Sequence, residues 1–256
     1  MEIIKKNVWI GVVLAAVLTG CRSHYEVANV SRTRMLIDNR YDREPDSGAS
    51  TFIAPFKQKV DSVMSPVIGH TAKELVAERP ESPLGNLMAD VLMWVSPRYN
   101  EQPVFSVVNM GGIRAAIGQG KVTRGDILDV SPFQNKICFL TLSGNKVTEL
   151  FEQMAMTGGE AVSSGVKLCF TADHRLQSAT VNGEAVDPAH SYRIVTIDYL
   201  AEGNDKMTAF KAKQDVITHN GESNIFHNIL IDFFIEKEKQ GVAVDADLEG
   251  RVTQLQ

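Results

Sequence analysis

The sequence predicts an α/β (α+β) fold, a single domain in which a mixed sheet is flanked by helices. Short apolar runs typical of buried strands recur along the chain, as at residues 104–108 and 137–142. Between them, apolar residues repeat at helical spacing, as at residues 84–95 and 226–234. Because the two patterns intermix and no segment repeats, we expect one domain rather than a solenoid or a bundle.

The folded domain is expected to begin with a helix and a short strand. Residues 53–65 carry apolar side chains at helical spacing, which predicts a helix that docks on the domain, and a strand at 67–69 follows. Ser82 before Pro83 predicts the start of a long helix, since serine is a favoured N-cap and proline suits the first helical position. Pro97 is expected to end that helix.

Serine and glycine residues mark the elements in the middle of the chain. Residues 125–128 predict a short helix before the strand at 137–142. Ser143 is expected to cap the next helix, which the pair Gly158 and Gly159 closes.

A hairpin and the last long helix are expected in the remaining part. Three strands are predicted, at residues 166–170, 178–181 and 192–197. Asn182-Gly183 is a strong signal for a two-residue hairpin turn, here leading into residues 185–186. Ser223 is expected to cap the last long helix, and Gly241 follows its end.

The first twenty residues are predicted to be an export signal and not part of the folded domain. Lys5 and Lys6 precede an apolar stretch at 8–18 that is too short to span a bilayer unaided. The stretch ends in Leu-Thr-Gly-Cys at 18–21, which resembles a bacterial lipobox. This resemblance implies cleavage before Cys21 and lipid attachment to its sulfur. An ordinary signal peptide or a core helix is the alternative.

The expected organisation is therefore a lipoprotein signal peptide at 1–20, a polar tether at 21–52 and the folded domain at 53–256. Such a protein would be a membrane-anchored lipoprotein of the bacterial cell envelope, facing the periplasm or the cell surface.

Charge and cysteine content limit the partners. The formal net charge is −5 and no basic run exists, which argues against a nucleic-acid surface. Cys138 and Cys169 fall in predicted strands with apolar neighbours. They could pair outside the cytoplasm, or both could remain buried thiols. Neither has a nearby Cys or His at metal-ligand spacing.

A turn after the strand at 104–108 carries the first candidate binding residues, Asn109, Gly111, Gly112 and Arg114. The glycines permit a tight turn with uncovered backbone N–H groups. Arginine offers a planar fork that matches phosphate or carboxylate oxygens. The alternative is a surface loop with a solvated arginine.

Two later loops carry aromatic and polar residues of the same kind. Phe133 could stack on a base, or it could be a lid over the core, and Asn135 could contact a base edge. Tyr199 follows the strand at 192–197 and precedes a sharp turn, and Asp205 could accept hydrogen bonds from two ribose hydroxyls. A turn-forming or helix-capping role is the alternative for this aspartate.

Five segments, in this order, resemble the C-terminal domain of the 5′-nucleotidase family, which includes periplasmic UDP-sugar hydrolases and animal ecto-5′-nucleotidases. They are Glu81-Ser82-Pro83-Leu84-Gly85-Asn86-Leu87, Asn109-Met110-Gly111-Gly112-Ile113-Arg114, Pro132-Phe133-Gln134-Asn135, Tyr199-Leu200-Ala201-Glu202-Gly203-Asn204-Asp205 and Glu249-Gly250-Arg251-Val252. The resemblance covers about residues 67–252, nearly all of the expected domain.

The resemblance implies roles for these residues in substrate binding. Asn109 would lie near the nucleoside and Arg114 would grip phosphate. Phe133 and Tyr199 would clamp the base from two sides, with Asn135 at its edge. Asp205 would bind the ribose.

The chain departs from the family pattern at several positions. Tyr199 stands where phenylalanine is usual, which keeps the stacking face and adds a hydroxyl. Lys206 and Met207 follow Asp205, where the family usually has glycine and an aromatic residue. Arg79 is close to the family's arginines before the Leu-Gly-Asn helix but is not in register.

The largest departure concerns catalysis. Family members carry an N-terminal metallophosphatase domain with two metal ions, and none of the six histidines here stands in its signature motifs. The stretch before Val67 is too short to hold such a domain. We therefore expect no catalytic residue, metal ligand or cofactor in this chain, and a divalent metal pair on a partner metallophosphatase subunit.

The leading hypothesis is a nucleotide- or nucleoside-recognising half of a 5′-nucleotidase-type phosphoester hydrolase, acting in nucleotide catabolism with that separate subunit. The alternative is a lipid-anchored nucleoside- or nucleotide-binding protein with no catalytic role. A third hypothesis is a scaffold that kept the fold and lost its ligand. Neither a Gly-x-Ser-x-Gly elbow nor a Walker loop is present.

Overall fold

The computed structural model describes residues 25–41 and 46–255, and the chain divides into two units, Met1–Phe52 and Ile53–Gln256. The predicted signal peptide and Cys21 lie outside the described residues. Residues 25–41 form no helix or strand and are exposed. Within the described ranges, no helix combines the length and apolar character needed to cross a membrane.

Helix α2 (Ser47–Met64) corrects two expectations for the start of the domain. It begins at Ser47 rather than at residue 53, because the Asp46 carboxylate accepts hydrogen bonds from the backbone N–H groups of Gly48 (2.8 Å) and Ala49 (3.0 Å). None of its residues is buried, so the expectation that this helix docks on the domain is wrong.

A mixed sheet forms the centre of the second unit, as predicted, and it has five strands. Its strand order is β10 (Gln214–Thr218), β4 (Ile137–Ser143), β9 (Ser191–Ile197), β2 (Phe105–Val108) and β5 (Ala161–Val162). Strands β2 and β9 are parallel, and the other neighbours are antiparallel. The sequence did not indicate β5 or β10.

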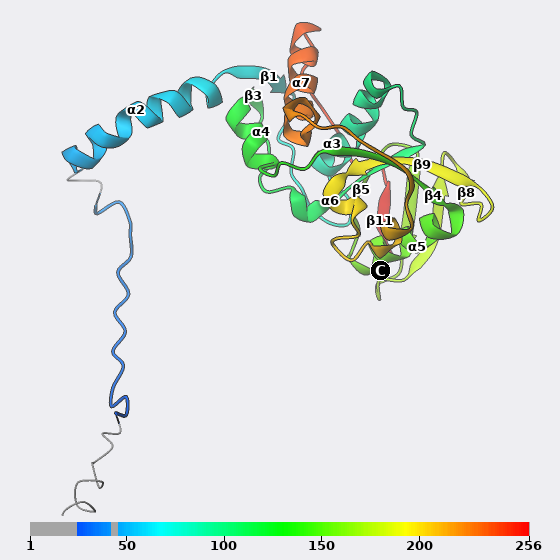
Figure 1. Ribbon diagram of the computed structural model, residues 1–256, viewed down its shortest axis with the longest axis horizontal. Coiled ribbons are helices and arrows are strands. Elements are labelled where there is room, and N and C mark those ends of the chain that lie inside the picture. Colours follow the sequence, from blue (N-terminus) through cyan, green and yellow to red (C-terminus); the bar gives the residue numbers. More distant parts are fainter. Residues whose placement is uncertain (1–24, 42–45, 256) are drawn as a thin grey trace, which may run out of the picture. The chain divides into compact units, whose positions relative to one another are not determined.

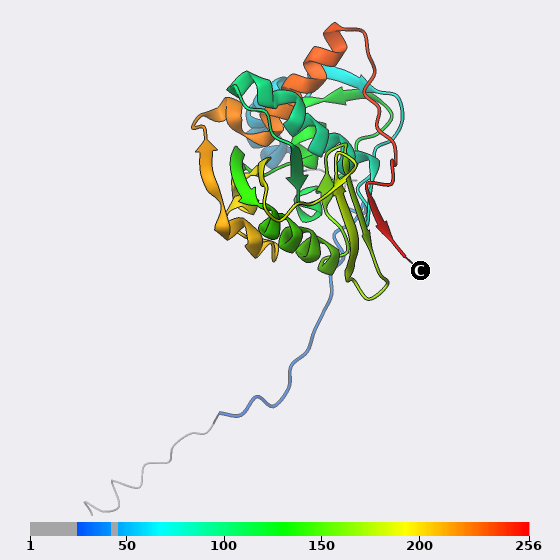
Figure 2. The same ribbon diagram turned by 90° about the vertical axis from the view of Figure 1, so that its right-hand side faces the viewer.

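Two smaller sheets complete the strands. Strand β1 (Val67–Thr71) pairs with β3 (Gly120–Thr123). The other sheet has the order β11 (Val252–Gln254), β6 (Val166–Phe170), β7 (Leu176–Val181) and β8 (Glu184–Ala185). Asn182 and Gly183 make the predicted hairpin turn with φ of 54° and 83°. Figure 2 shows β11 beside the β6–β7 hairpin.

Helices α3 (Pro83–Val95) and α5 (Gly144–Met156) cover opposite faces of the five-stranded sheet (Figure 1). The Ser106 hydroxyl donates to the Ala89 carbonyl of α3 at 2.6 Å. The ring of the preceding residue, Phe105, lies 5.5 Å from that of Phe151 in α5. Successive strand residues point to opposite faces, so the two contacts fix one helix on each side.

The predicted helix caps are only partly confirmed. Ser82 caps α3 by accepting the backbone N–H of Gly85 at 3.2 Å. Ser143 occupies the N-cap position of α5 without a side-chain cap bond. Ser223 lies in a short 3-10 turn, η4 (Glu222–Asn224), so its assignment as cap of α7 (Phe226–Lys239) is wrong.

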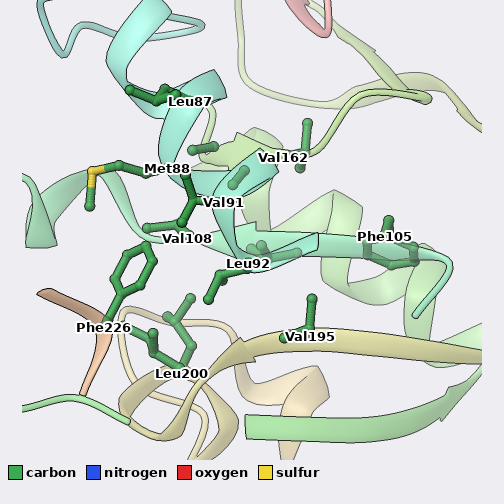
Figure 3. Close-up of a cluster of buried hydrophobic side chains, with 14 of the residues drawn as sticks. Leu87, Met88, Val91, Leu92, Phe105, Val108, Val162, Val195, Leu200 and Phe226 are labelled. Carbon is green, nitrogen blue, oxygen red and sulfur yellow. The ribbon is translucent and has the colours of Figure 1, made fainter. Parts of the chain in front are cut away.

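The core joins these elements into one apolar interior. Figure 3 shows side chains from α3, β2, β9 and α7 meeting, with Met88, Val108 and Phe226 grouped at one end. Cys138 is buried in β4 and Cys169 is half-buried in β6, and both are free thiols.

Candidate functional site

Seven of the eight predicted binding residues line one cavity of about 210 Å³. They are Asn109, Gly111, Gly112, Phe133, Asn135, Tyr199 and Asp205. They follow the ends of β2 and β9 or precede the start of β4. Since β2 and β9 are parallel and β4 is antiparallel to β9, these three loops leave the sheet at the same edge.

The first wall of the cavity is a single 3-10 turn, η2 (Met110–Gly112), that directly follows β2. Gly112 donates its N–H to the Asn109 carbonyl at 3.0 Å, which closes the turn. A Cβ atom at Gly112 would lie 2.9 Å from Oδ1 of Asn109, so the glycine is required by this close approach. Asn109 is buried, with 4% of its surface exposed.

Asp205 is held by two side chains that line the same cavity. The Asn109 amide Nδ2 donates to Asp205 Oδ2 at 2.6 Å, and the Tyr199 hydroxyl donates to Oδ1 at 2.8 Å. The hydrogen bond to the carboxylate raises the pKa of Tyr199 above its ordinary value. Asp205 has a φ of 52°, a left-handed conformation that aspartate tolerates better than most residues.

Another part of the cavity lining, residues 133–135, is hydrogen-bonded to the start of α7. The N–H of Phe226 donates to the Asn135 carbonyl at 2.8 Å. His227 Nδ1 lies 3.1 Å from the Phe133 carbonyl oxygen. Because a carbonyl oxygen only accepts, this nitrogen carries the hydrogen. The Phe133 side chain stays 45% exposed and is therefore no buried lid over the core.

Arg114 is the predicted residue that does not line this cavity. Its side chain is exposed, and guanidinium Nη1 donates to the Gly111 carbonyl at 3.2 Å. Its backbone N–H donates to the Val130 carbonyl at 2.9 Å. The guanidinium is thus tied to the cavity wall by one hydrogen bond.

A second cavity of about 280 Å³ shares Gly111 and Asp205 with the first. Its other lining residues are Arg79, Thr157, Glu160 and Lys206. Two cationic and two acidic side chains therefore surround it, with no excess of either charge.

Glu160 connects the second cavity to the η2 turn. Its side chain is 1% exposed and accepts hydrogen bonds from Arg79 Nη2 at 2.8 Å and from the Met110 N–H at 2.6 Å. Burial raises the pKa of the Glu160 carboxyl above its ordinary value, while Met110 and Arg79 act in the opposite direction. Sequence reasoning missed Glu160, because its partners lie far away in the sequence.

The donor set of the first cavity does not fit a divalent metal. Asp205 is the one acidic residue lining the first cavity, and both of its oxygens already accept side-chain hydrogen bonds. Across residues 25–41 and 46–255, no three His, Cys, Asp or Glu side chains are grouped so that they could hold a metal ion.

Comparison with known proteins identifies the family. The family model described as 5′-nucleotidase, C-terminal domain, matches residues 67–212. The trifunctional nucleotide phosphoesterase protein YfkN of Bacillus subtilis is 26% identical over 239 residues, which cover 86% of this chain and 16% of YfkN. The cell wall protein Lmo0130 of Listeria monocytogenes is 25% identical over 232 residues, which cover 81% of this chain and 29% of Lmo0130.

A solved structure supports the same assignment. The 5′-nucleotidase precursor from Thermus thermophilus superposes with a TM-score of 0.70 and 27% identity, covering 81% of this chain and 43% of that protein. The chain spans less than a third of the length of the two curated relatives. The family model and the structural match together show that the chain belongs to the 5′-nucleotidase family and carries its C-terminal domain.

Proposed function

We propose that the chain binds a nucleotide or nucleoside and acts as the substrate-recognising half of a 5′-nucleotidase-type phosphoester hydrolase. A separate metallophosphatase subunit would supply the metal pair and the hydrolytic step. One observation carries the proposal: seven of the eight residues expected to contact the substrate, drawn from three loops, line a single cavity.

The two aromatic rings of the cavity suit a nucleobase. Phe133 is 45% exposed and Tyr199 is 38% exposed, so both rings present apolar surface that a ligand can cover. A base stacked against them would cover apolar surface, and each stacked base contributes about 1–3 kcal/mol where this has been measured by alanine substitution. The Asn135 amide would then contact the base edge.

The polar wall suits the remainder of a nucleotide. Asp205 retains acceptor capacity for ribose hydroxyls, since each carboxylate oxygen accepts two hydrogen bonds and one on each is taken. Arg114 donates one hydrogen bond to the Gly111 carbonyl, and its other guanidinium N–H groups remain available for a phosphate beside the cavity.

The separate metal-bearing subunit is inferred from the sequence, in which no histidine stands in a metallophosphatase motif. Attachment of the chain to a membrane of the cell envelope through Cys21 is part of the same proposal. Relatives of the chain include a cell wall protein, which is consistent with the cell envelope.

A role in ligand binding without catalysis is the second candidate. The stacking rings and the Asp205 carboxylate need no metal to hold a nucleoside, so the cavity by itself supports it. The two candidates differ in whether a partner subunit exists.

Calorimetry with adenosine, AMP and UDP-glucose tests the shared part of both candidates. We expect binding by the wild type and loss of binding in Phe133→Ala and Tyr199→Ala. Leu248→Ala, which truncates an exposed apolar side chain outside the cavity, serves as the control. Unchanged binding in both aromatic variants would remove the cavity from either function.

Hydrolysis assays separate the two candidates. AMP and a divalent metal are incubated with the chain alone, with a candidate metallophosphatase alone, and with both. Faster hydrolysis in the mixture supports the split enzyme. Hydrolysis by this chain alone that survives substitution of Arg114 would contradict it, and hydrolysis unaffected by adding the chain would favour the binding protein.

A further inference from the structure

The Tyr199 hydroxyl has a position in the cavity that its ring alone does not explain. Stacking needs only the aromatic face, and a phenylalanine would provide it. Here the hydroxyl donates to Asp205 Oδ1 at 2.8 Å, while the Tyr199 carbonyl accepts from the Asn204 side chain at 2.8 Å. Both ends of the residue are therefore engaged with the turn that carries Asp205.

The two hydrogen bonds to Asp205 reach different oxygens of one carboxylate. Tyr199 donates to Oδ1 and the buried Asn109 amide donates to Oδ2 at 2.6 Å. A carboxylate held at one oxygen can still rotate about its last single bond, whereas one held at both oxygens cannot. Each oxygen then keeps one lone pair for another donor, so the carboxylate can accept one further hydrogen bond at each oxygen.

We propose that Tyr199 is a positioning residue that sets the Asp205 carboxylate to accept both hydroxyls of a vicinal diol, so that the cavity selects ribonucleosides over 2′-deoxyribonucleosides. This inference rests on the proposed function, in which Asp205 binds the sugar. It adds a residue that determines sugar specificity and a substrate class, ribose with both hydroxyls present.

The same hydrogen bond couples the sugar to the base. The ring of Tyr199 cannot swing away from the cavity without breaking its bond to Asp205. Loss of the hydroxyl therefore affects the sugar contact first, because the stacking face and the ring size are retained. Selectivity for the diol should fall more than affinity for the base.

The test is the variant Tyr199→Phe, with binding of adenosine, 2′-deoxyadenosine, uridine and 2′-deoxyuridine measured by calorimetry. We expect the preference of the wild type for ribose over deoxyribose to fall by about three- to tenfold, the scale of the net contribution of one typical hydrogen bond. Affinity for the deoxynucleosides should stay within about twofold of the wild type, because they lack the second hydroxyl.

Two controls keep the outcomes separate. Tyr192→Phe removes a hydroxyl that accepts the Asp187 N–H and does not line the cavity, so its sugar preference should equal that of the wild type. Asp205→Asn should abolish the preference. Circular dichroism melting of each variant shows whether the fold is retained.

The results distinguish this inference from the proposed function on which it rests. An unchanged ribose preference in Tyr199→Phe, with the preference lost in Asp205→Asn, overturns the role of the hydroxyl alone. Tighter binding of all four ligands by Tyr199→Phe also overturns it, because the hydroxyl would then compete with the sugar for Asp205. A wild type that binds none of the four overturns the inference, and the proposed function falls with it only if AMP is not bound either.

Discussion

Glu160 is predicted to support the site by two hydrogen bonds that two substitutions can separate. Glu160→Ala removes both, which leaves the Met110 N–H without an acceptor in a buried position. Glu160→Gln keeps an oxygen for Met110 but turns an amide N–H₂ toward the Arg79 guanidinium, so that only the bond to Met110 survives. The two substitutions therefore differ chiefly in whether the Met110 N–H in the η2 turn keeps its hydrogen-bond acceptor.

The magnitudes follow from the burial of these groups. An unsatisfied buried donor costs about 1–3 kcal/mol, and we expect Glu160→Ala to lower the free energy of unfolding by an amount in this range or slightly above it. We expect Glu160→Gln to cost less than about 1 kcal/mol at pH 7, because Arg79 is 38% exposed and water replaces its lost partner. The neutral amide also avoids burying a charge.

The pH dependence has a definite sign. The pKa of Glu160 is raised in the folded state, so folding favours its protonated form. Its contribution to stability is therefore greatest below the ordinary pKa of a glutamate and is lost as the pH rises through the raised value. Lowering the pH from 7 toward 4.5 should stabilise the wild type relative to Glu160→Gln, which has no titrating group at this position.

Urea unfolding followed by circular dichroism at several pH values provides the assay. The difference between wild type and Glu160→Gln should change with pH, whereas the difference between Glu160→Ala and Glu160→Gln should not. Equal destabilisation by Ala and Gln would refute the reasoning, since it would mean that the Met110 bond contributes nothing.

Three further predictions concern the core, the thiols and the η2 turn. Arg251→Met should lower the free energy of unfolding by about 3 kcal/mol in urea titrations. The Arg251 side chain is 2% exposed, and its removal leaves the Asp90 carboxylate and the buried Val162 carbonyl without their donor. Cys138, whose pKa burial raises to about 11, should react with a thiol reagent at pH 8 far more slowly than the half-buried Cys169. Gly112→Ala should lower the free energy of unfolding by about 1–3 kcal/mol and weaken nucleoside binding in calorimetry. Gly118→Ala should do neither, because a Cβ atom added there meets no atom within 4 Å.

Elements with strong local signals could be predicted from the sequence. Helix α3 has a serine cap and proline at its start, and its buried face follows the expected spacing. The hairpin turn at Asn182-Gly183 is likewise determined by two residues that tolerate positive φ. Strand β10 could not be predicted, since all five of its residues are exposed and their pattern carries no buried face. Strand β5 has only two residues.

The candidate site divides in the same way. Seven of its residues stand in short motifs whose order the chain preserves, so they could be named without a structure. Glu160 and the hydrogen bond between Tyr199 and Asp205 could not, because a contact between side chains depends on how separate elements pack. The exposed position of Arg114 beside the cavity is a packing result of the same kind.

The cap assignment at Ser223 is wrong because the start of α7 finds its hydrogen-bond partner in the loop that lines the cavity. The first N–H of α7, that of Phe226, finds its acceptor in the Asn135 carbonyl, so the helix needs no serine cap there. His227 adds a second bond to the same segment, at the Phe133 carbonyl. A helix start that lacks a local cap thus holds the loop bearing the exposed Phe133 ring. The stability of α7 and the geometry of the cavity are therefore linked through the backbone of residues 133–135, and a disturbance at the start of α7 would reach the cavity by this route.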